Sequence, residues 1–194
     1  MRGQQARGSS RRAQIVSAAI EVIAADGFAN ATFSRIAKQA GLSSTSLISY
    51  HFAGKEDLLA ACLTEIEAIT NGFMQARIGA ARGHVAQLRA YVESNVALVG
   101  EHPAAVRALI DLVKNAGSQS QAVNGRLALI EEHFRGGQDA GVFRHFDARM
   151  AAIALTSGVD AVVATAARAT PEPAELARLG RDLSDLYVRA ITPA

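Results

Sequence analysis

The sequence contains very little cysteine. Cys62 is the single cysteine among 194 residues, so no disulfide can form within the chain, and this usage is typical of proteins from a reducing cytosol. We expect Cys62 to lie on a long helix, on the side that faces the interior of the protein. A redox-sensing role is not indicated, because no exposed basic group is clearly beside it in the sequence.

Long uncharged segments are also absent. The apolar run after Arg12 is broken by Gln14, Ser17 and Glu21, so it does not have the form of a signal peptide. The longest uncharged stretches flank Asp160 and are shorter than the ~20 residues that a membrane span requires. We therefore expect a soluble, cytoplasmic protein with no membrane partner.

Motifs of common enzymes are missing as well. The sequence has no Gly-rich phosphate loop, no GxSxG elbow, no pair of cysteines and no HExxH or similar pair of histidines. Glu131, Glu132 and His133 are adjacent, but consecutive helical residues point to different sides and do not converge on a metal. We expect neither catalytic activity nor a metal or cofactor.

Positive charge is concentrated near the N-terminus. The whole chain carries +2, whereas residues 1–55 have seven basic and two acidic residues, which give +5. Residues 1–10 are predicted to form a disordered basic arm, because they contain no acid and several Gly, Ser and Gln residues. Arg11 and Arg12 could neutralise phosphates or enter a minor groove. The alternative is an extension that only improves solubility.

Residues 32–59, TFSRIAKQAGLSSTSLISYHFAGKEDLL, have the pattern of a helix, a tight turn, a second helix and the start of a third. Thr32 can cap a first helix whose apolar residues recur at a spacing of three and four. Gly41 can adopt the left-handed conformation that commonly ends a helix, and Leu42 can pack beneath the turn.

The second helix is rich in hydroxyl groups, and Leu47 and Phe52 are its expected anchors to the core. Serine and threonine are mediocre helix formers, so propensity does not explain their density here. Contacts with base edges and phosphates would explain it, and a Ser-rich loop is the alternative. Tyr50, His51 and Lys55 follow, where all three could donate hydrogen bonds to phosphate oxygens. The alternatives are that Tyr50 fills the core, that His51 is a structural histidine and that Lys55 is a solvated charge. The residues predicted to contact DNA are Arg11, Arg12, Thr32, Ser34, Arg35, Ser43, Ser44, Thr45, Ser46, Ser49, Tyr50, His51 and Lys55.

This block resembles the DNA-binding domain of the TetR family of bacterial transcriptional repressors. The matching residues are Ile15, Ala18, Ala19, Gly27, Phe28, Thr32, residues 36–41, Tyr50, Phe52, Lys55, Glu56, Leu58 and Leu59. The segment from Gly41 to Phe52 is one residue longer than the usual family spacing, so Ser43 and Ser44 compete for the cap. The resemblance covers about the first third of the chain. It implies an all-α fold of about nine helices, with a three-helix DNA-binding domain at 11–54 and a helical effector-binding and dimerisation domain at 55–194.

Helical periodicity continues downstream. It predicts helices at about 55–77, 84–100, 103–116 and 120–139, and a final pair at 150–168 and after Pro173. The resemblance places an effector pocket among the middle helices, although polar residues of this kind are more often ordinary core or surface residues than ligand contacts, and aromatic residues at helical spacing are usually core. The candidates are Phe73, Tyr91, Asn95, Arg107, Asp111, Asn115, His133, Phe134, Thr156 and Asp160.

The final pair of helices has the spacing of a helix-packing surface. The first is dense in alanine, and leucines recur at three and four in the second. The resemblance implies that this pair packs against its copy as a four-helix bundle, and that the homodimer binds a pseudo-palindromic operator in double-stranded DNA as a ligand-responsive repressor. A monomer core or a protein-binding adaptor are the alternatives. The predicted interface residues are Val159, Val162, Val163, Leu176, Leu179, Leu183, Leu186 and Tyr187.

Overall fold

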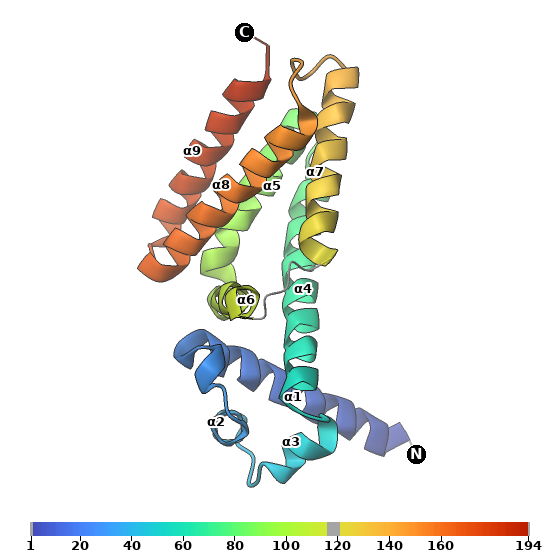
Figure 1. Ribbon diagram of the computed structural model, residues 1–194, viewed down its shortest axis with the longest axis vertical. Helices are drawn as coiled ribbons and strands as arrows, with labels where there is room; N and C mark the ends of the chain where they lie inside the picture. Colours follow the sequence, from blue (N-terminus) through green and yellow to red (C-terminus); the bar gives the residue numbers. More distant parts are fainter. Residues whose placement is uncertain (1, 116–120, 194) are drawn as a thin grey trace. The chain divides into compact units, whose positions relative to one another are not determined.

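The computed structural model describes residues 2–115 and 121–193, in which the chain forms nine α-helices, one short 3-10 helix and no strand (Figure 1). The elements are α1 (Arg2–Asp26), η1 (Phe28–Asn30), α2 (Phe33–Gln39), α3 (Ser46–His51), α4 (Lys55–Ala80), α5 (His84–Glu101), α6 (Pro103–Asn115), α7 (Gln121–Asp139), α8 (Ala148–Ala169) and α9 (Pro173–Ile191). The predicted all-α fold is confirmed, and the predicted downstream helices lie within a few residues of the observed ones.

Helix α1 begins earlier than the sequence predicts. The expected disordered arm at residues 1–10 is replaced by helix from Arg2 onward. The segment contains no proline and includes glutamine, alanine and arginine, which are good helix formers. Adding residues to an existing helix requires no new nucleation, so α1 can extend through this segment.

The chain divides into two compact units. Unit 1 comprises Met1–Ile69 with Ala104–Gly117, and unit 2 comprises Thr70–Pro103 with Ser118–Ala194. The expected boundary after residue 54 therefore differs from the observed division. The reason is burial: the first half of α4 and most of α6 supply apolar side chains to the core of unit 1.

The core of unit 1 joins the first three α-helices to parts of α4 and α6. Its fully buried side chains include Ile15, Ile23, Ile36, Ile48, Leu58, Cys62, Ile66 and Leu112. Cys62 is 0% exposed, as predicted, and burial raises the pKa of its thiol to about 12. A thiol in this environment stays protonated at neutral pH and is a poor nucleophile.

Unit 2 is built around α5, which packs mainly against α9 and also against α8 and α7. Its core includes Leu88, Val92, Phe134, Leu155 and Val159. Gly180 of α9 lies so close to α5 that an added Cβ would stand 3.3 Å from the Cα atom of Glu93. A larger residue at position 180 would therefore push the two helices apart.

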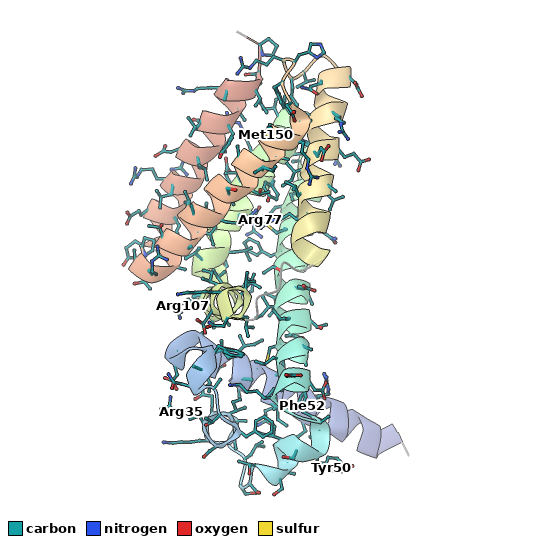
Figure 2. The ribbon with its side chains drawn as sticks, viewed as in Figure 1. Arg35, Tyr50, Phe52, Arg77, Arg107 and Met150 are labelled. Atoms are coloured by element: carbon teal, nitrogen blue, oxygen red, sulfur yellow. The ribbon has the colours of Figure 1, made fainter. Side chains whose placement is uncertain are left out.

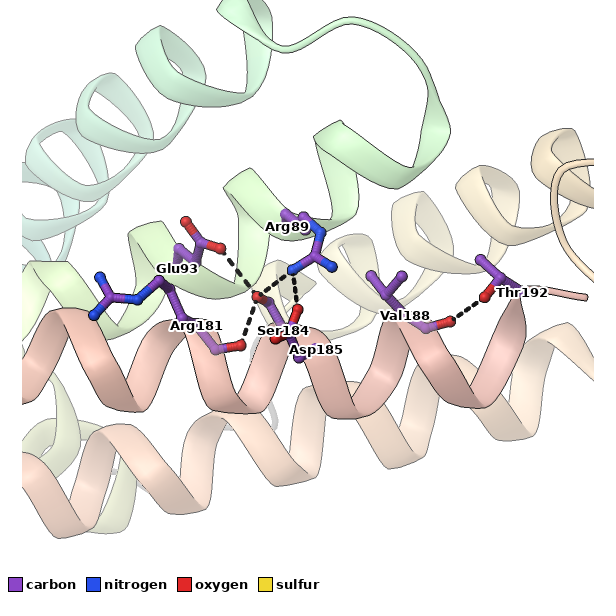
Figure 3. Close-up of polar contacts among 7 residues, drawn as sticks. All are labelled: Arg89, Glu93, Arg181, Ser184, Asp185, Val188 and Thr192. Carbon is purple, nitrogen blue, oxygen red and sulfur yellow. Dashed lines mark hydrogen bonds and ion pairs between the residues drawn. The ribbon is translucent and has the colours of Figure 1, made fainter. Parts of the chain in front are cut away.

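A polar network crosses the same helix pair (Figure 3). The hydroxyl of Ser184, which is 0% exposed, donates to Glu93 of α5 at 3.0 Å and accepts from Arg89 at 3.3 Å. Arg89 also pairs with Asp185, and this contact lowers the pKa of that carboxyl. The hydrogen bonds to Glu93 and Arg89 compensate for the burial of the Ser184 hydroxyl. Since both partners lie on α5, these bonds also fix the register of α9 against α5.

Helix α8 is, by length and composition alone, the one helix of the described parts that could cross a membrane. Core helices of soluble proteins pass the same test. Here α8 packs against α7 and α5 within unit 2, and Asp160, near its middle, pairs with Arg126 of α7 at 2.6 Å. These contacts bury 33% of the most apolar stretch of α8, so helix packing within the chain accounts for part of its apolar composition.

Candidate nucleic-acid interface

The turn between α2 and α3 has the geometry that the sequence predicts. Thr32 caps α2 by accepting a hydrogen bond from the Arg35 amide at 3.3 Å. Gly41 has a φ of 63°, in the left-handed region. The Leu42 amide then reaches back to the Ala37 carbonyl at 2.8 Å, which closes the helix end as a Schellman motif.

Ser44 caps the second helix of the motif. Its hydroxyl oxygen accepts from the Ser46 amide at 3.1 Å, and its carbonyl accepts from the Leu47 amide at 3.4 Å. Thr45, the residue before Ser46, has a helical backbone but makes no side-chain capping bond. Ser44 is therefore the capping residue, and Thr45 is the first residue of the helix by its backbone conformation. The competition between Ser43 and Ser44 is thus resolved in favour of Ser44.

The anchors of α3 differ in part from the prediction. Phe52 is buried, as expected, but Leu47 is 38% exposed and Ile48 is 0% exposed. Ile48 and Phe52 are four residues apart and share one face, whereas Leu47 is rotated by about 100° from Ile48 and faces outward. The assignment of Leu47 to the core was therefore wrong, and Ile48 takes its place.

The outer side of α3 and the turn before it carry the predicted polar residues. Exposed hydroxyl side chains occur at Ser43, Ser44, Thr45, Ser46 and Ser49. Tyr50 is 82% exposed (Figure 2), and its ring meets the His51 ring edge to face at 5.1 Å. Large aromatic side chains are rarely exposed to this extent. The Tyr50 hydroxyl and ring are therefore available to a binding partner.

Three arginines extend this surface. The guanidinium of Arg12 on α1 lies 4.8 Å from the centre of the Phe52 ring, which brings a positive charge to the end of α3. Arg35 of α2 pairs with Asp26 at 2.7 Å, but both side chains are about half exposed. Exposed pairs of this kind contribute little, so Arg35 can exchange its partner for a phosphate. Arg11 donates to Gln14 at 2.8 Å and is also exposed.

Lys55 and Asp111 hold the backbone of Phe28 from two sides. Lys55 at the start of α4 donates to the Phe28 carbonyl at 3.0 Å, and its ammonium lies 4.5 Å from the centre of the Phe28 ring. The Phe28 amide donates to the carboxylate of Asp111 on α6. Lys55, which the sequence analysis expected at a phosphate, is thus engaged in packing η1 against α4.

Three of the expected effector residues belong to unit 1. Arg107, Asp111 and Asn115 lie on α6, and the amide of Asn115 donates to the carbonyl of Asp111 at 2.7 Å. Asp111 is committed to the Phe28 amide. The sequence did not reveal this role, because residues 28 and 111 are distant in the chain.

The remaining effector candidates lie in unit 2, in separate groups. Thr156 is buried and donates within its own helix, to the Ala152 carbonyl at 2.9 Å. Phe73 packs edge to face on His102 and stacks under the Arg77 guanidinium at 3.5 Å. Neither arrangement leaves a polar group without a partner.

The Nε2–H group of His133 donates to the His84 carbonyl at 3.0 Å, and the His133 ring contacts those of His84, Phe134 and Phe143. Burial lowers the pKa of His133, the nearby His84 ring acts in the same direction, and the hydrogen bond opposes both. The group is an aromatic cluster at the meeting of α5 and α7, with a histidine that prefers to be neutral.

Tyr91, Asn95 and Asp160 converge, and they meet a residue that the sequence analysis did not name. Arg126 of α7 donates to both carboxylate oxygens of Asp160, at 3.1 Å and 2.6 Å. Tyr91 lies within electrostatic range of both, and burial first, then Asp160, raises its pKa to about 12 against the effects of Arg126 and Asn95. No local pattern marks Arg126, because its partners lie on two other helices.

The predicted interface residues of α8 and α9 fall into two classes. Val159 and Leu176 are 0% and 4% exposed and belong to the interior of unit 2, so their assignment to an intermolecular surface was wrong. Their helical positions turn inward toward α5. Leu186 is 63% exposed, whereas Val162, Val163, Leu179, Leu183 and Tyr187 are half buried. Exposed apolar residues that the prediction missed are Ile153, at 39%, and Met150, at 61% (Met150 is labelled in Figure 2).

The glycine turn, the Ser44-capped helix with its outward hydroxyls, and the arginines beside it define a helix-turn-helix DNA-binding protein. Residues 15–62 match the family model of bacterial regulatory proteins, tetR family. The chain is 33% identical over 156 residues to the HTH-type transcriptional regulator BetI of Cronobacter sakazakii, which covers 77% of this chain and 76% of that protein. The chain belongs to the TetR family of transcriptional regulators.

Solved structures agree at the level of the fold. A transcriptional regulator from Saccharomonospora viridis, solved in complex with choline, has a TM-score of 0.82 at 22% identity and covers 96% of this chain and 100% of its own. A TetR-family regulator from Rhodococcus sp. has a TM-score of 0.79 at 19% identity, over 92% of this chain and 99% of its own. The protein is therefore a DNA-binding transcriptional regulator, and the expectation that it is not an enzyme is confirmed by its family.

Proposed function

We propose that the chain acts as a homodimeric repressor, which binds a pseudo-palindromic operator through the α3 helices of two copies and leaves it when a small-molecule effector binds. The observation that carries this proposal is the exposed side of residues 43–50, at α3 and the turn before it, where five hydroxyl side chains and an 82% exposed tyrosine stand in solvent. Ser44 caps the helix, whereas the packing of unit 1 gives Ser49 and Tyr50 no comparable role, and DNA in the major groove offers hydrogen-bond partners for such exposed groups.

The Ser44 cap assigns roles along the helix. Thr45 and Ser46 occupy its first turn, and the N-terminal residues of a recognition helix are those that meet base edges. Tyr50 and His51 at its end, with Arg12 beside them, suit phosphate oxygens. The sequence preference thus rests on Thr45 and Ser46, and the general affinity on the other three.

The dimer contact is assigned to the exposed side of α8 and α9. Met150, Ile153 and Leu186 leave apolar surface in solvent on two neighbouring helices (Figure 1). Burial of such residues against a second copy would remove this surface from water. Two copies are also needed to give one regulator two half-sites.

Release of DNA is assigned to the Phe28 clamp. Lys55 of α4 binds the carbonyl of Phe28, and Asp111 of α6 binds its amide. Helix α4 continues into unit 2, and helix α6 begins at Pro103, the last residue of the first segment of unit 2. A movement of α4 or α6 would therefore disturb η1 and the α1–α2 junction. A coupling free energy of about 1–3 kcal/mol between effector and operator is typical of such devices.

Ligand responsiveness is typical of the family, and the structural relative from Saccharomonospora viridis was solved with choline. Choline is accordingly one compound to test as an effector of this chain. The protein is assigned to the cytoplasm, where its DNA lies.

The proposal is tested by selection of binding sites from random duplex DNA. The selected sequences should converge on a pseudo-palindrome with half-sites whose centres are about 10 base pairs, one helical turn, or a multiple of this apart. Enrichment of a single asymmetric half-site would contradict the dimeric reading, and no enrichment at all would contradict sequence-specific binding.

A further inference from the structure

Three side-chain polar atoms of the described residues are buried without a hydrogen-bond partner, and all three belong to unit 2. One is Nδ1 of His84, in the aromatic cluster, and the other two lie together around Asp160. The hydroxyl of Tyr91 and the Nε atom of Arg126 have no hydrogen-bond partner among the described residues. Asn95 is close to Tyr91, but its side-chain amide donates to the Tyr91 carbonyl at 2.8 Å. Buried polar groups are normally paired, so two unpaired groups in one place need an explanation.

The ion pair in this cluster is unequal in its exposure. The side chain of Arg126 is 33% exposed, whereas that of its partner Asp160 is 54% exposed. Burial disfavours the guanidinium charge, and the hydrogen bonds and charge of Asp160 more than compensate, so that the pKa of Arg126 is raised. Loss of the ion pair would therefore cost more free energy at Arg126 than at Asp160, because water can solvate the more exposed Asp160 carboxylate.

The cluster borders the apolar core of unit 2. Leu127, next to Arg126, and Val163, one turn after Asp160, pack against that core, as does Tyr91 itself. A molecule whose head reaches Tyr91 and Arg126 would thus have its body beside apolar side chains. Such sites combine an apolar lining with a few convergent polar groups.

We infer that Tyr91 and Arg126 form the recognition end of the effector site, and that they take the carboxylate head of a small molecule with an apolar body. The inference rests on the proposed function, since it names the effector class of that regulator. The incoming carboxylate replaces Asp160 on Arg126 and accepts from Nε and from the Tyr91 hydroxyl, both of which donate. Asp160 acts as a built-in competitor that occupies the guanidinium until the effector arrives, and it then turns to solvent.

A cationic head is disfavoured at the same position. A quaternary ammonium would approach Arg126 and would have to compete with it for Asp160. The cluster therefore favours a carboxylate over an ammonium of the same size, and choline would not be expected to bind through it.

Calorimetric titration of the full chain with octanoate tests the inference, with octyltrimethylammonium as a probe of similar body and opposite charge. Wild type should bind octanoate and show weaker or no binding of the cation. Tyr91→Phe and Arg126→Gln should each weaken octanoate binding by about tenfold, the loss expected for a charge-assisted hydrogen bond. Tyr187→Phe and Arg135→Gln, which change groups that have partners outside the cluster, should bind octanoate as wild type does.

Asp160→Asn separates the inference from a merely structural role. Removal of the competitor should tighten octanoate binding, whereas a structural ion pair would leave it unchanged or weaken it. Thermal unfolding without probe checks that each variant folds, and Tyr91→Phe should lose no stability because its hydroxyl has no partner. Equal binding of both probes, or loss of binding in Asp160→Asn, would overturn the inference.

DNA binding without any probe distinguishes this failure from a failure of the proposed function. A chain that binds its operator but not octanoate contradicts only the carboxylate site. A chain that binds no operator contradicts the proposed function itself.

Discussion

The two compact units present opposite kinds of side chain on the helices assigned to partners. Unit 1 presents hydroxyl groups, a tyrosine and arginines around α3, whereas unit 2 presents Met150, Ile153 and Leu186 on α8 and α9. The first set suits a hydrated polyanion and the second suits another apolar surface. The two surfaces therefore suit different kinds of partner, and in a dimer the operator affinity of unit 1 should depend on the apolar contact made by unit 2.

The largest effect on stability is expected from the α3 anchor. Ile48→Ala should lower the free energy of unfolding by about 2–5 kcal/mol, because it leaves a cavity in the core of unit 1 where Ile48 is 0% exposed. Urea unfolding followed by circular dichroism measures the loss. Leu47→Ala is the matched control next to it and should cost well under half as much, since Leu47 is 38% exposed. Equal losses would show that the register of α3 is wrong.

A charge on the apolar side of α9 should separate the two copies. Leu186→Glu replaces a 63% exposed leucine, so the single chain should still fold, but sedimentation should show the mass of one chain. Operator affinity should fall by a factor of about 10²–10⁴, the gain that linked binding sites usually provide. Leu129→Glu on α7, at a 68% exposed position, is the control and should stay dimeric. A wild-type mass of one chain at micromolar concentration would refute the dimer directly.

Substitutions on α3 should divide affinity from specificity. Tyr50→Phe should weaken binding by about 1 kcal/mol on every duplex, because it removes one hydrogen bond to a phosphate. Thr45→Ala and Ser46→Ala should instead change the preferred bases in repeated site selection. Thr165→Ala on α8, an exposed threonine of unit 2, should change neither. If the Thr45 and Ser46 variants kept the wild-type preference, base contacts would have to be sought elsewhere on α3.

Lys55 and Arg12 test whether basic residues of unit 1 serve the fold or the DNA. Lys55→Gln should lower stability by about 1 kcal/mol through loss of its bond to Phe28, and should leave the salt dependence of DNA binding unchanged. Arg12→Gln should reduce the slope of log affinity against log salt by about one, as expected for one lost phosphate contact. The reverse pattern would return Lys55 to the phosphate role that the sequence suggested.

The smallest effect concerns pH and His133 in unit 2. Its pKa is lowered from 6.5 in the folded chain, so the unfolded chain binds more protons below that pH. Stability should therefore be full above pH 6.5, fall as the pH drops toward the folded pKa, and then level off. His133→Gln should remove this part of the pH dependence in thermal unfolding, whereas His145→Gln, at an exposed position, should not. An identical profile for wild type and His133→Gln would contradict this assignment.

Sequence patterns predicted the parts of the molecule whose structure is decided locally. Thr32, Gly41 and Leu42 form the cap and the turn through contacts within a few residues, and all three behave as expected. Leu47 and Ile48 show the limit of this reasoning. Both are apolar and adjacent, and only the cap at Ser44 and the position of α1 decide which of them enters the core.

The site residues of unit 2 could be predicted less well, because they are brought together by tertiary packing. Arg126 meets Tyr91 and Asp160 across three helices, and no spacing in the sequence connects them. Asp111 likewise reaches an amide 83 residues away in the chain. Val159 looks the same as Val162 in an alanine-rich sequence, although the first is fully buried and the second half exposed.

Sequence-specific binding of DNA by α3 can be measured by titration across a salt series. The purified chain would be titrated onto its selected duplex and onto a scrambled duplex of the same composition, by fluorescence anisotropy. We expect tight binding that weakens steeply with salt and favours the selected duplex at every salt concentration. Equal affinity for the two duplexes, or no binding to either at low salt, would contradict it.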